Sequence, residues 1–295
     1  EELRQAVARL VEGVNRDQEQ KARSQPQPLR SLLIDDCLDA GTEYNAGGAR
    51  YNWSVVNVGG LANVADSLAA VRAVVFEQGE VTGAELLAAL RDDFAGQEPL
   101  RRRLESCPRF GNDQPEVDAL AAEVAAFVFG ELRRYAPWRG GRFLPGCLMF
   151  VTYAGAGEGV MATPDGRHAG TPIADSAGPV QGRDRSGPTA MIRSVTRISH
   201  WLAPGTLVVN ARFGRSMFAT PAQRDRLKDL IRTYFSLGGM QLQINVVDQA
   251  VLRDAIAHPE QHGDLIVRVG GYSEYFNRLS PALQESLLER TEHTC

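Results

Sequence analysis

Near the end of the chain, a short apolar run leads directly into two glycines and a group of aromatic residues. Residues 265–269 are typical of a buried strand, and Gly270 and Gly271 follow it. Glycine has the widest backbone freedom and no side chain to shield its α-carbon, so chemistry on the backbone carbon itself is open here. A turn is the commoner meaning of a Gly-Gly pair, and the pair taken alone favours it. Tyr272 and Phe276 are unusual companions for a plain loop tip.

The residues around the glycines resemble the signature of glycyl radical enzymes. In that signature Arg-Val, a small residue, Gly and Tyr precede a Phe four positions further on, and Arg268, Val269, Tyr272 and Phe276 stand in this register. The resemblance identifies Gly271 as the radical-bearing residue. Loss of a hydrogen from its α-carbon would leave an electron delocalised over the flanking amide nitrogen and carbonyl. That delocalisation needs a planar centre, which a Cβ would hinder.

Two longer segments extend the resemblance. Residues 35–68, which contain Tyr51-Asn52-Trp53-Ser54, look like a block found in the dehydratase and lyase branches of the family. Residues 163–190, which contain Ala174-Asp175-Ser176, resemble its central block. Loops as long as the second segment tend to be functional, but no single residue in it receives a role. The matches run in order from Leu32 to His293 and favour a dehydratase or lyase over a formate C-acetyltransferase.

The resemblance implies a fold and a division of the chain. The fold class is α/β: the second half of the ten-stranded barrel of glycyl radical enzymes, with surrounding helices and a C-terminal glycyl radical loop. Residues 1–165 would form a helical region and the start of the barrel half, in the later part of a pyruvate formate-lyase-like domain. Residues 166–295 would form the glycine radical domain.

The resemblance also implies a mechanism and partners. A separate radical-SAM activating enzyme with a [4Fe-4S] cluster would take hydrogen from Gly271, and the glycyl radical would then take hydrogen from a cysteine whose thiyl attacks a small-molecule substrate. No bound cofactor and no metal are expected. The family's cysteine lies in a Gly-Cys-x-Glu segment ahead of the block at Asp35, so we expect a preceding portion or a complementary subunit to supply it. The complete enzyme is expected to be a homodimer.

Other residues that could do chemistry are better explained structurally. Cys147 follows Gly146, but the next residues are Leu148 and Met149, so the glutamate of the Gly-Cys-x-Glu pattern is missing. A small thiol buried in the core is the better interpretation. His258 and His262 stand four apart, but Pro259 between them breaks the helical register that would aim both at one ion.

Strands alternating with capped helices predict an α/β architecture with a largely parallel sheet. Thr82 with Glu85 and Thr220 with Gln223 have capping-box spacing. Alternating patterns predict strands over 207–213 and 240–246, the second with an apolar face and an amide face, and an unbroken apolar run predicts a buried strand over 148–151. The arginines at 101–103 are expected on a solvated helix face.

Composition limits the class of protein. The 295 residues are 43% hydrophobic with a net charge of -4, which suits a globular core and gives no basic surface for nucleic acid. No apolar stretch reaches the ~20 residues that cross a bilayer, so neither a nucleic-acid nor a membrane partner is expected, and the cytoplasm is the default location. Four widely spaced cysteines, the last being Cys295, suggest reduced thiols. A helical stripe that starts without Met suggests the later portion of a longer protein.

Three hypotheses about function remain. The chain could be the radical-bearing portion of a dehydratase or lyase that cleaves a C–O, C–N or C–C bond. It could instead be a non-catalytic radical carrier subunit that lends Gly271 to a partner. The third is an α/β binding protein whose glycines are only turns.

Overall fold

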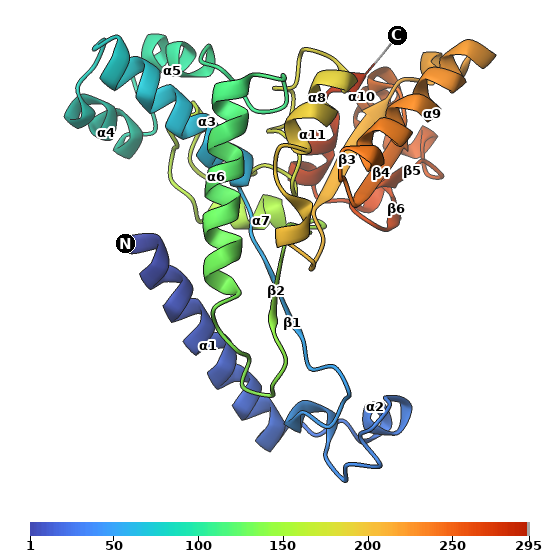
Figure 1. Cartoon of the computed structure of the whole chain (residues 1–295). Helices are drawn as coiled ribbons and strands as arrows, with labels where there is room; N and C mark the ends of the chain where they lie inside the picture. Colours follow the sequence, from blue (N-terminus) through green and yellow to red (C-terminus); the bar gives the residue numbers. More distant parts are fainter. Residues whose placement is uncertain (294–295) are drawn as a thin grey trace. The chain divides into compact units, whose positions relative to one another are not determined.

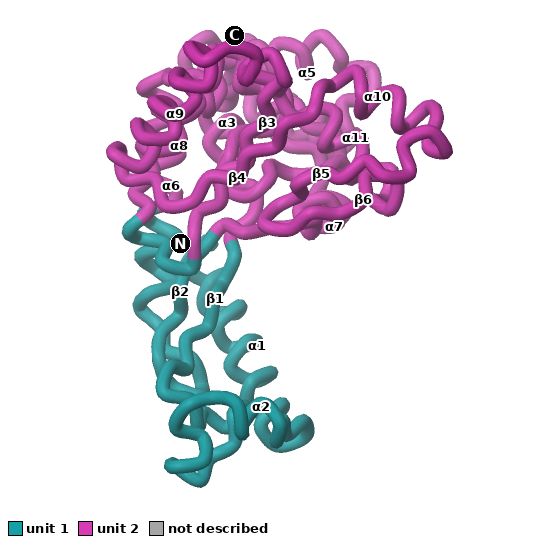
Figure 2. Tube along the Cα trace, turned by 90° about the vertical axis from the view of Figure 1, so that its right-hand side faces the viewer, with its two compact units in different colours: residues 1–57, 126–146, 201–205 teal, residues 58–125, 147–200, 206–295 magenta. Residues whose placement is uncertain are grey.

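The computed structural model describes residues 1–293 of the chain, which form two compact units (Figure 2). The first comprises residues 1–57, 126–146 and 201–205; the second comprises residues 58–125, 147–200 and the described residues from 206 onward. In the described part, no helix is both long enough and apolar enough to cross a membrane.

The first unit consists of a long helix, short helical turns and one pair of strands. α1 buries Val7 and Val11, and the Asn15 side chain bonds the backbone at Ala136 and Trp138. β1 and β2 run parallel. The elements of the first unit are α1 (Glu2–Ser24), α2 (Pro28–Leu33), η1 (Tyr44–Ala46), β1 (Ser54–Asn57), the end of α6 (Pro115–Leu132), β2 (Phe143–Gly146) and all but the first residue of η3 (His200–Leu202).

Helices form the N-terminal part of the second unit. The capping box of Thr82 and Glu85 opens α4 as the spacing predicts, and buried residues such as Val74, Leu86 and Leu104 join these helices in one core cluster. The elements are α3 (Leu61–Val71), the π-helical turn η2 (Arg72–Glu77), α4 (Gly83–Arg91), α5 (Glu98–Glu105), the start of α6, α7 (Thr152–Glu158) and α8 (Pro188–Val195).

A parallel sheet of order β4-β3-β7 organises the rest of this unit, and Figure 1 shows its strands β3 and β4 side by side. β3 and β4 are joined through α9, which has the predicted capping box at Thr220 and ends before Gly238 in left-handed conformation. The elements are β3 (Val208–Phe213), η4 (Arg215–Phe218), α9 (Pro221–Ser236), β4 (Gln241–Val246), α10 (Gln249–Ala257), η5 (Pro259–Gln261), β5 (Ile266–Arg268), β6 (Ser273–Tyr275), η6 (Phe276–Arg278), α11 (Pro281–Glu289) and β7 (Glu292–His293). The parallel α/β prediction is confirmed.

The prediction of a buried strand over residues 148–151 is wrong. The strand β2 ends at Gly146, and the chain turns at Met149, whose carbonyl accepts the Thr152 N–H at 2.7 Å. Phe150 has a left-handed φ of +49°, which is incompatible with an extended strand. The apolar run therefore forms a turn that leads into α7.

A buried arginine fixes the C-terminal end of α11. Arg212 on β3 is 1% exposed, and its guanidinium donates to the carbonyls of Leu287, at 2.9 Å, Leu288 and Arg290. The last carbonyls of a helix have no partner inside the helix. Arg212 therefore satisfies groups that would otherwise be buried without hydrogen bonds.

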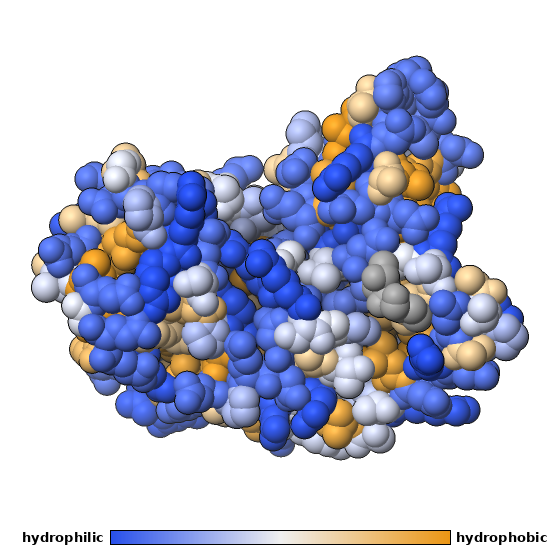
Figure 3. Space-filling view, turned by 90° about the horizontal axis from the view of Figure 1, so that it is seen from above, coloured by the Kyte–Doolittle hydropathy of each residue, from blue (hydrophilic) through white to orange (hydrophobic). Residues whose placement is uncertain are grey.

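The surface shows no continuous apolar area from one side. Hydrophilic residues cover most of the face in Figure 3, and hydrophobic residues gather there in separate groups. Large exposed apolar side chains include Leu33 on α2 and Phe76 on η2, at 75% and 79% exposed.

Candidate functional site

Gly270 and Gly271 form the tip of a tight antiparallel hairpin. β5 and β6 pair from Ile266 with Tyr275 to Arg268 with Ser273, and the Val269 N–H donates to the Tyr272 carbonyl at 3.0 Å. Two residues remain at the tip. Gly271 has a φ of +102°, in the left-handed region that favours glycine. The pair therefore does reverse the direction of the chain, as the commoner meaning of a Gly-Gly pair predicts.

The hairpin is anchored by alternate residues along its strands. Val267, Val269 and Phe276 are at most 1% exposed and pack in one core cluster with residues of α7, α10 and α11. The Phe276 N–H donates to the Leu265 carbonyl at 2.8 Å and closes the base of the hairpin. The signature residues Val269 and Phe276 therefore hold the tip in place through apolar burial.

The amide face of β4 holds the remaining signature residue. Nε of Arg268 donates to Oε1 of Gln243 at 2.9 Å, and Nδ2 of Asn245 donates to the Arg268 carbonyl at 3.3 Å. On the other, apolar face Val246 is 41% exposed, as is Met240 just before the strand. The sequence showed the alternation of amides on this strand without showing which residue they bind.

The α-carbon of Gly271 is open. A Cβ built on it would meet only the Cε1 atom of Phe150 within 4 Å among the described residues, at 3.6 Å. Gly271 is exposed, while Gly270 is buried against the backbone of Phe150. The arrangement leaves a backbone carbon accessible at the end of a rigid hairpin, where another molecule can reach its hydrogens.

The other candidates from the sequence are placed apart from this tip or are inert. Cys147 is 0% exposed, and burial raises its pKa to about 12, so the thiolate is not populated at neutral pH. His258 and His262 do converge, contrary to expectation, but on the carboxylate of Asp254, at 2.9 and 2.6 Å. Within residues 1–293 no group of three or more His, Cys, Asp or Glu side chains could hold a metal.

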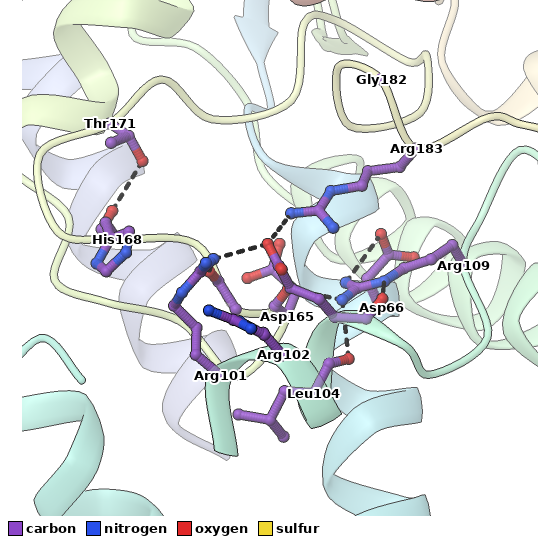
Figure 4. Close-up of polar contacts among 12 residues, drawn as sticks. Asp66, Arg101, Arg102, Leu104, Arg109, Asp165, His168, Thr171, Gly182 and Arg183 are labelled. Carbon is purple, nitrogen blue, oxygen red and sulfur yellow. Dashed lines mark hydrogen bonds and ion pairs between the residues drawn. The ribbon is translucent and has the colours of Figure 1, made fainter. Parts of the chain in front are cut away.

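The loop of residues 163–190 is fixed by buried polar contacts (Figure 4). The Asp165 carbonyl accepts from the Arg109 guanidinium at 2.7 Å, and its carboxylate accepts from Nδ2 of Asn63 at 2.8 Å. Arg109 also faces Asp66, whose carboxylate accepts the Phe110 N–H at 2.7 Å. Burial raises the pKa of Asp66 to about 7, and this effect outweighs the opposing Arg109 charge 3.6 Å away. The two facing atoms, Oδ2 of Asp66 and Nη1 of Arg109, make no hydrogen bond.

The arginines of α5 are only partly solvated. Arg102 is exposed as expected, but Arg101 and Arg183 both pair with the half-buried carboxylate of Glu105. The Arg183–Glu105 pair joins α5 to the loop. The prediction of a wholly solvated arginine face was therefore wrong for Arg101.

A second buried pair joins the same loop to the C-terminal end of the chain. The Asp175 carboxylate accepts from the Arg290 guanidinium at 2.5 Å and from Nδ2 of Asn210 on β3 at 2.8 Å. Burial raises the pKa of Asp175, and Arg290 opposes that shift. The loop that sequence reasoning left without a role is thus a structural connection between the sheet, α5 and the segment after α11.

Comparisons with known proteins agree with the hairpin signature. The pyruvate formate lyase-like family model matches residues 1–157 and the glycine radical model matches residues 173–277. The chain is 40% identical to the probable dehydratase YbiW of Escherichia coli and 35% identical to trans-4-hydroxy-L-proline dehydratase of Clostridioides difficile, covering 90% and 92% of this chain. It spans about a third of the length of these relatives, 34% and 35%.

Solved structures give the same result. The B12-independent glycerol dehydratase of Clostridium butyricum superimposes with a TM-score of 0.95 at 38% identity over 99% of this chain and 37% of its own. A protein of Roseburia inulinivorans, described for 1,2-propanediol dehydration, gives 0.91 at 39% identity over 95% of this chain and 36% of its own. Since one family model covers more than half of its residues and the other covers the hairpin, the chain belongs to the pyruvate formate lyase-like family of glycyl radical enzymes.

Proposed function

We propose that the chain is the radical-bearing portion of a glycyl radical dehydratase or lyase, and that Gly271 carries the radical. The observation that supports this most strongly is the geometry of the tip: Gly271 has a φ of +102° and an open α-carbon, inside the segment that the glycine radical model matches. An α-carbon without a Cβ can flatten after it loses a hydrogen atom. The relatives named as dehydratases and a sulfite-lyase support elimination or bond cleavage.

The reaction moves one hydrogen atom at each step. A radical-SAM activating enzyme takes a hydrogen atom from the Gly271 α-carbon, and the glycyl radical takes one from a cysteine thiol in another part of the complete enzyme. The thiyl then takes a hydrogen atom from a small-molecule substrate, and the substrate radical loses its leaving group. The product radical takes the hydrogen atom back from the cysteine, which regenerates the thiyl. The chain's own part is to hold Gly271 in a fixed hairpin. Because Gly271 is exposed here, the rest of the complete enzyme would have to shield the radical.

We further propose the place of this chain in the complete fold. β1 and β2 and the β4-β3-β7 sheet would belong to one half of a ten-stranded barrel, and the β5–β6 hairpin would enter it. The boundary between the pyruvate formate-lyase-like part and the glycine radical domain would lie at residue 165. The two family-model matches, which leave residues 158–172 between them, support this division.

An anaerobic assay of the complete enzyme tests the proposal. After activation it is given glycerol, 1,2-propanediol, trans-4-hydroxyproline, isethionate, choline, or pyruvate with coenzyme A. We expect a dehydrated or cleaved product from one of the first five. Acetyl-coenzyme A would indicate a formate C-acetyltransferase instead, and a stable glycyl radical with no turnover on any substrate would indicate a radical carrier subunit.

A further inference from the structure

Phe150 occupies a backbone position that favours glycine. The Thr152 N–H donates to the Met149 carbonyl at 2.7 Å, so Phe150 and Val151 are the central residues of a turn. Phe150 has φ +49°, and Val151 has φ -106° and ψ -8°. A positive φ at the second position of a turn favours glycine there. A bulky side chain there is strained.

The strained turn is held by its neighbours. Met149 is 8% exposed, and its N–H donates to Oγ of Ser176 at 3.2 Å. On the other side Tyr153 is 0% exposed in the first turn of α7. Phe150 itself is 41% exposed, so burial of its ring in the core does not explain why a strained phenylalanine stands between two fixed positions.

The ring and backbone of Phe150 lie against the glycine tip. The Phe150 ring is 6.2 Å from the Tyr272 ring, centroid to centroid, at an angle of 48°. A Cβ on Gly270 would lie 3.3 Å from the Phe150 α-carbon, and one on Gly271 would lie 3.6 Å from its Cε1. The strained residue therefore lies beside both glycines and the tyrosine that follows them.

We propose that Phe150 is a positioning residue for the radical tip. The turn presents the Phe150 ring to one side of the Gly271 α-carbon and to Tyr272, and this contact keeps the tip in one position against the fixed segment 147–153. Loss of the ring lets the tip leave that position more often. The proposal rests on the proposed function, because it assigns the ring an effect on how readily Gly271 is activated and how long its radical survives.

Hydrogen exchange on the complete enzyme before activation tests the contact itself. The Val269 amide reports opening of the tip, because its N–H bonds the Tyr272 carbonyl at 3.0 Å. We expect at least fivefold faster exchange at this amide in Phe150→Ala and in Phe150→Gly. The glycine variant relieves the strain at φ +49°, so its thermal midpoint should not fall, which separates loss of positioning from loss of stability. Phe235→Ala, which removes a 49% exposed ring from α9, is the matched control and should leave the amide unchanged.

Electron paramagnetic resonance after anaerobic activation then tests the functional consequence. We expect Phe150→Gly to form the radical at least threefold faster than the wild type and to lose it at least threefold faster, and Phe150→Tyr to restore both rates. Unchanged exchange at Val269 together with unchanged radical kinetics in Phe150→Gly would overturn the inference and leave the proposed function intact. Absence of a glycine-centred signal in the wild type would overturn the proposed function and the radical part of the inference, while the exchange result would still decide the contact.

Discussion

Arg268 and Gln243 connect the strand of the glycine tip to the parallel sheet, through a hydrogen bond from Nε to Oε1 of 2.9 Å. β5 belongs to a separate two-stranded sheet with β6, and β4 to the sheet of β3 and β7. Side chains rather than a backbone ladder thus attach the hairpin at this point. Asn245 adds a second connection by donating to the Arg268 carbonyl at 3.3 Å.

Removal of this connection should loosen the hairpin. A hydrogen bond of this kind stabilises by about 1 kcal/mol, so Gln243→Ala should speed exchange of the Val269 amide roughly fivefold. Gln241 is a matched control on the same strand, because its Oε1 has no hydrogen-bond partner, and Gln241→Ala should change exchange little. Equal effects of the two variants would contradict the role given to Gln243.

The two glycines should differ in their tolerance of alanine. Gly271 has a φ of +102°, and a left-handed conformation costs an ordinary residue about 1–2 kcal/mol. At Gly270 the added Cβ would lie 3.3 Å from the Phe150 α-carbon, so a shift of a few tenths of an ångström accommodates it. In urea unfolding we expect a larger loss of stability for Gly271→Ala than for Gly270→Ala; the reverse order would contradict the turn geometry.

Asp66 should make stability depend on pH. Burial raises its pKa from 3.8 to about 7, so between these values the folded protein keeps a proton that the unfolded chain has released. Stability therefore falls as pH rises through this window and levels off above pH 7 or so. Asp118, whose pKa burial raises to about 6, acts in the same direction over a narrower range.

Asparagine variants of Asp66 and Asp118 distinguish the contributions of the two carboxyl groups to the pH dependence of stability. Asp66→Asn should flatten the dependence between about pH 6 and pH 7 and leave the fall below pH 6 that Asp118 contributes. Asp118→Asn should retain the fall up to about pH 7. The measurement is the midpoint of urea unfolding at half-unit steps of pH. A pH profile of Asp66→Asn identical to that of the wild type would show that Asp66 is ionised over the whole range tested.

Arg212 should be among the most sensitive polar residues. Its replacement by Met leaves the buried carbonyls at the end of α11 without a donor, and each unsatisfied buried group costs about 1–3 kcal/mol. We expect a loss of about 3 kcal/mol or more in the free energy of unfolding. Arg215→Ala, which removes a 69% exposed side chain, should cost less than about 0.5 kcal/mol.

Periodicity and capping residues were enough to predict several regular elements of the second unit. The helix after Thr220, the strands on both sides of it and the two-glycine turn all follow local rules, and all are present. The strand at 148–151 failed because residue type alone does not show that a phenylalanine will take a left-handed φ. Met149 and Tyr153, on either side of it, are held by tertiary contacts that the local sequence does not show.

The proposed site was predictable only where its chemistry lies on the backbone. The radical is proposed for Gly271 on a signature that is local in sequence, from Arg268 to Phe276. Phe150 and Gln243 lie far from it along the chain, and nothing in their own segments indicates that they contact the tip. The pairs Asp66–Arg109 and Asp175–Arg290 were missed for the same reason, since charged residues are ordinarily expected at the surface.

The most direct test of the central claim is electron paramagnetic resonance of the complete enzyme after anaerobic activation. A radical on Gly271 retains one α-hydrogen, so we expect a doublet in the wild type and in Gly270→Ala, and no such signal in Gly271→Ala. Oxygen adds to a carbon-centred radical and breaks the backbone, so air exposure should release the segment that follows Gly271 in the first two proteins alone, as mass spectrometry would show. A normal doublet in Gly271→Ala, or cleavage elsewhere in the chain, would contradict the assignment of the radical to Gly271.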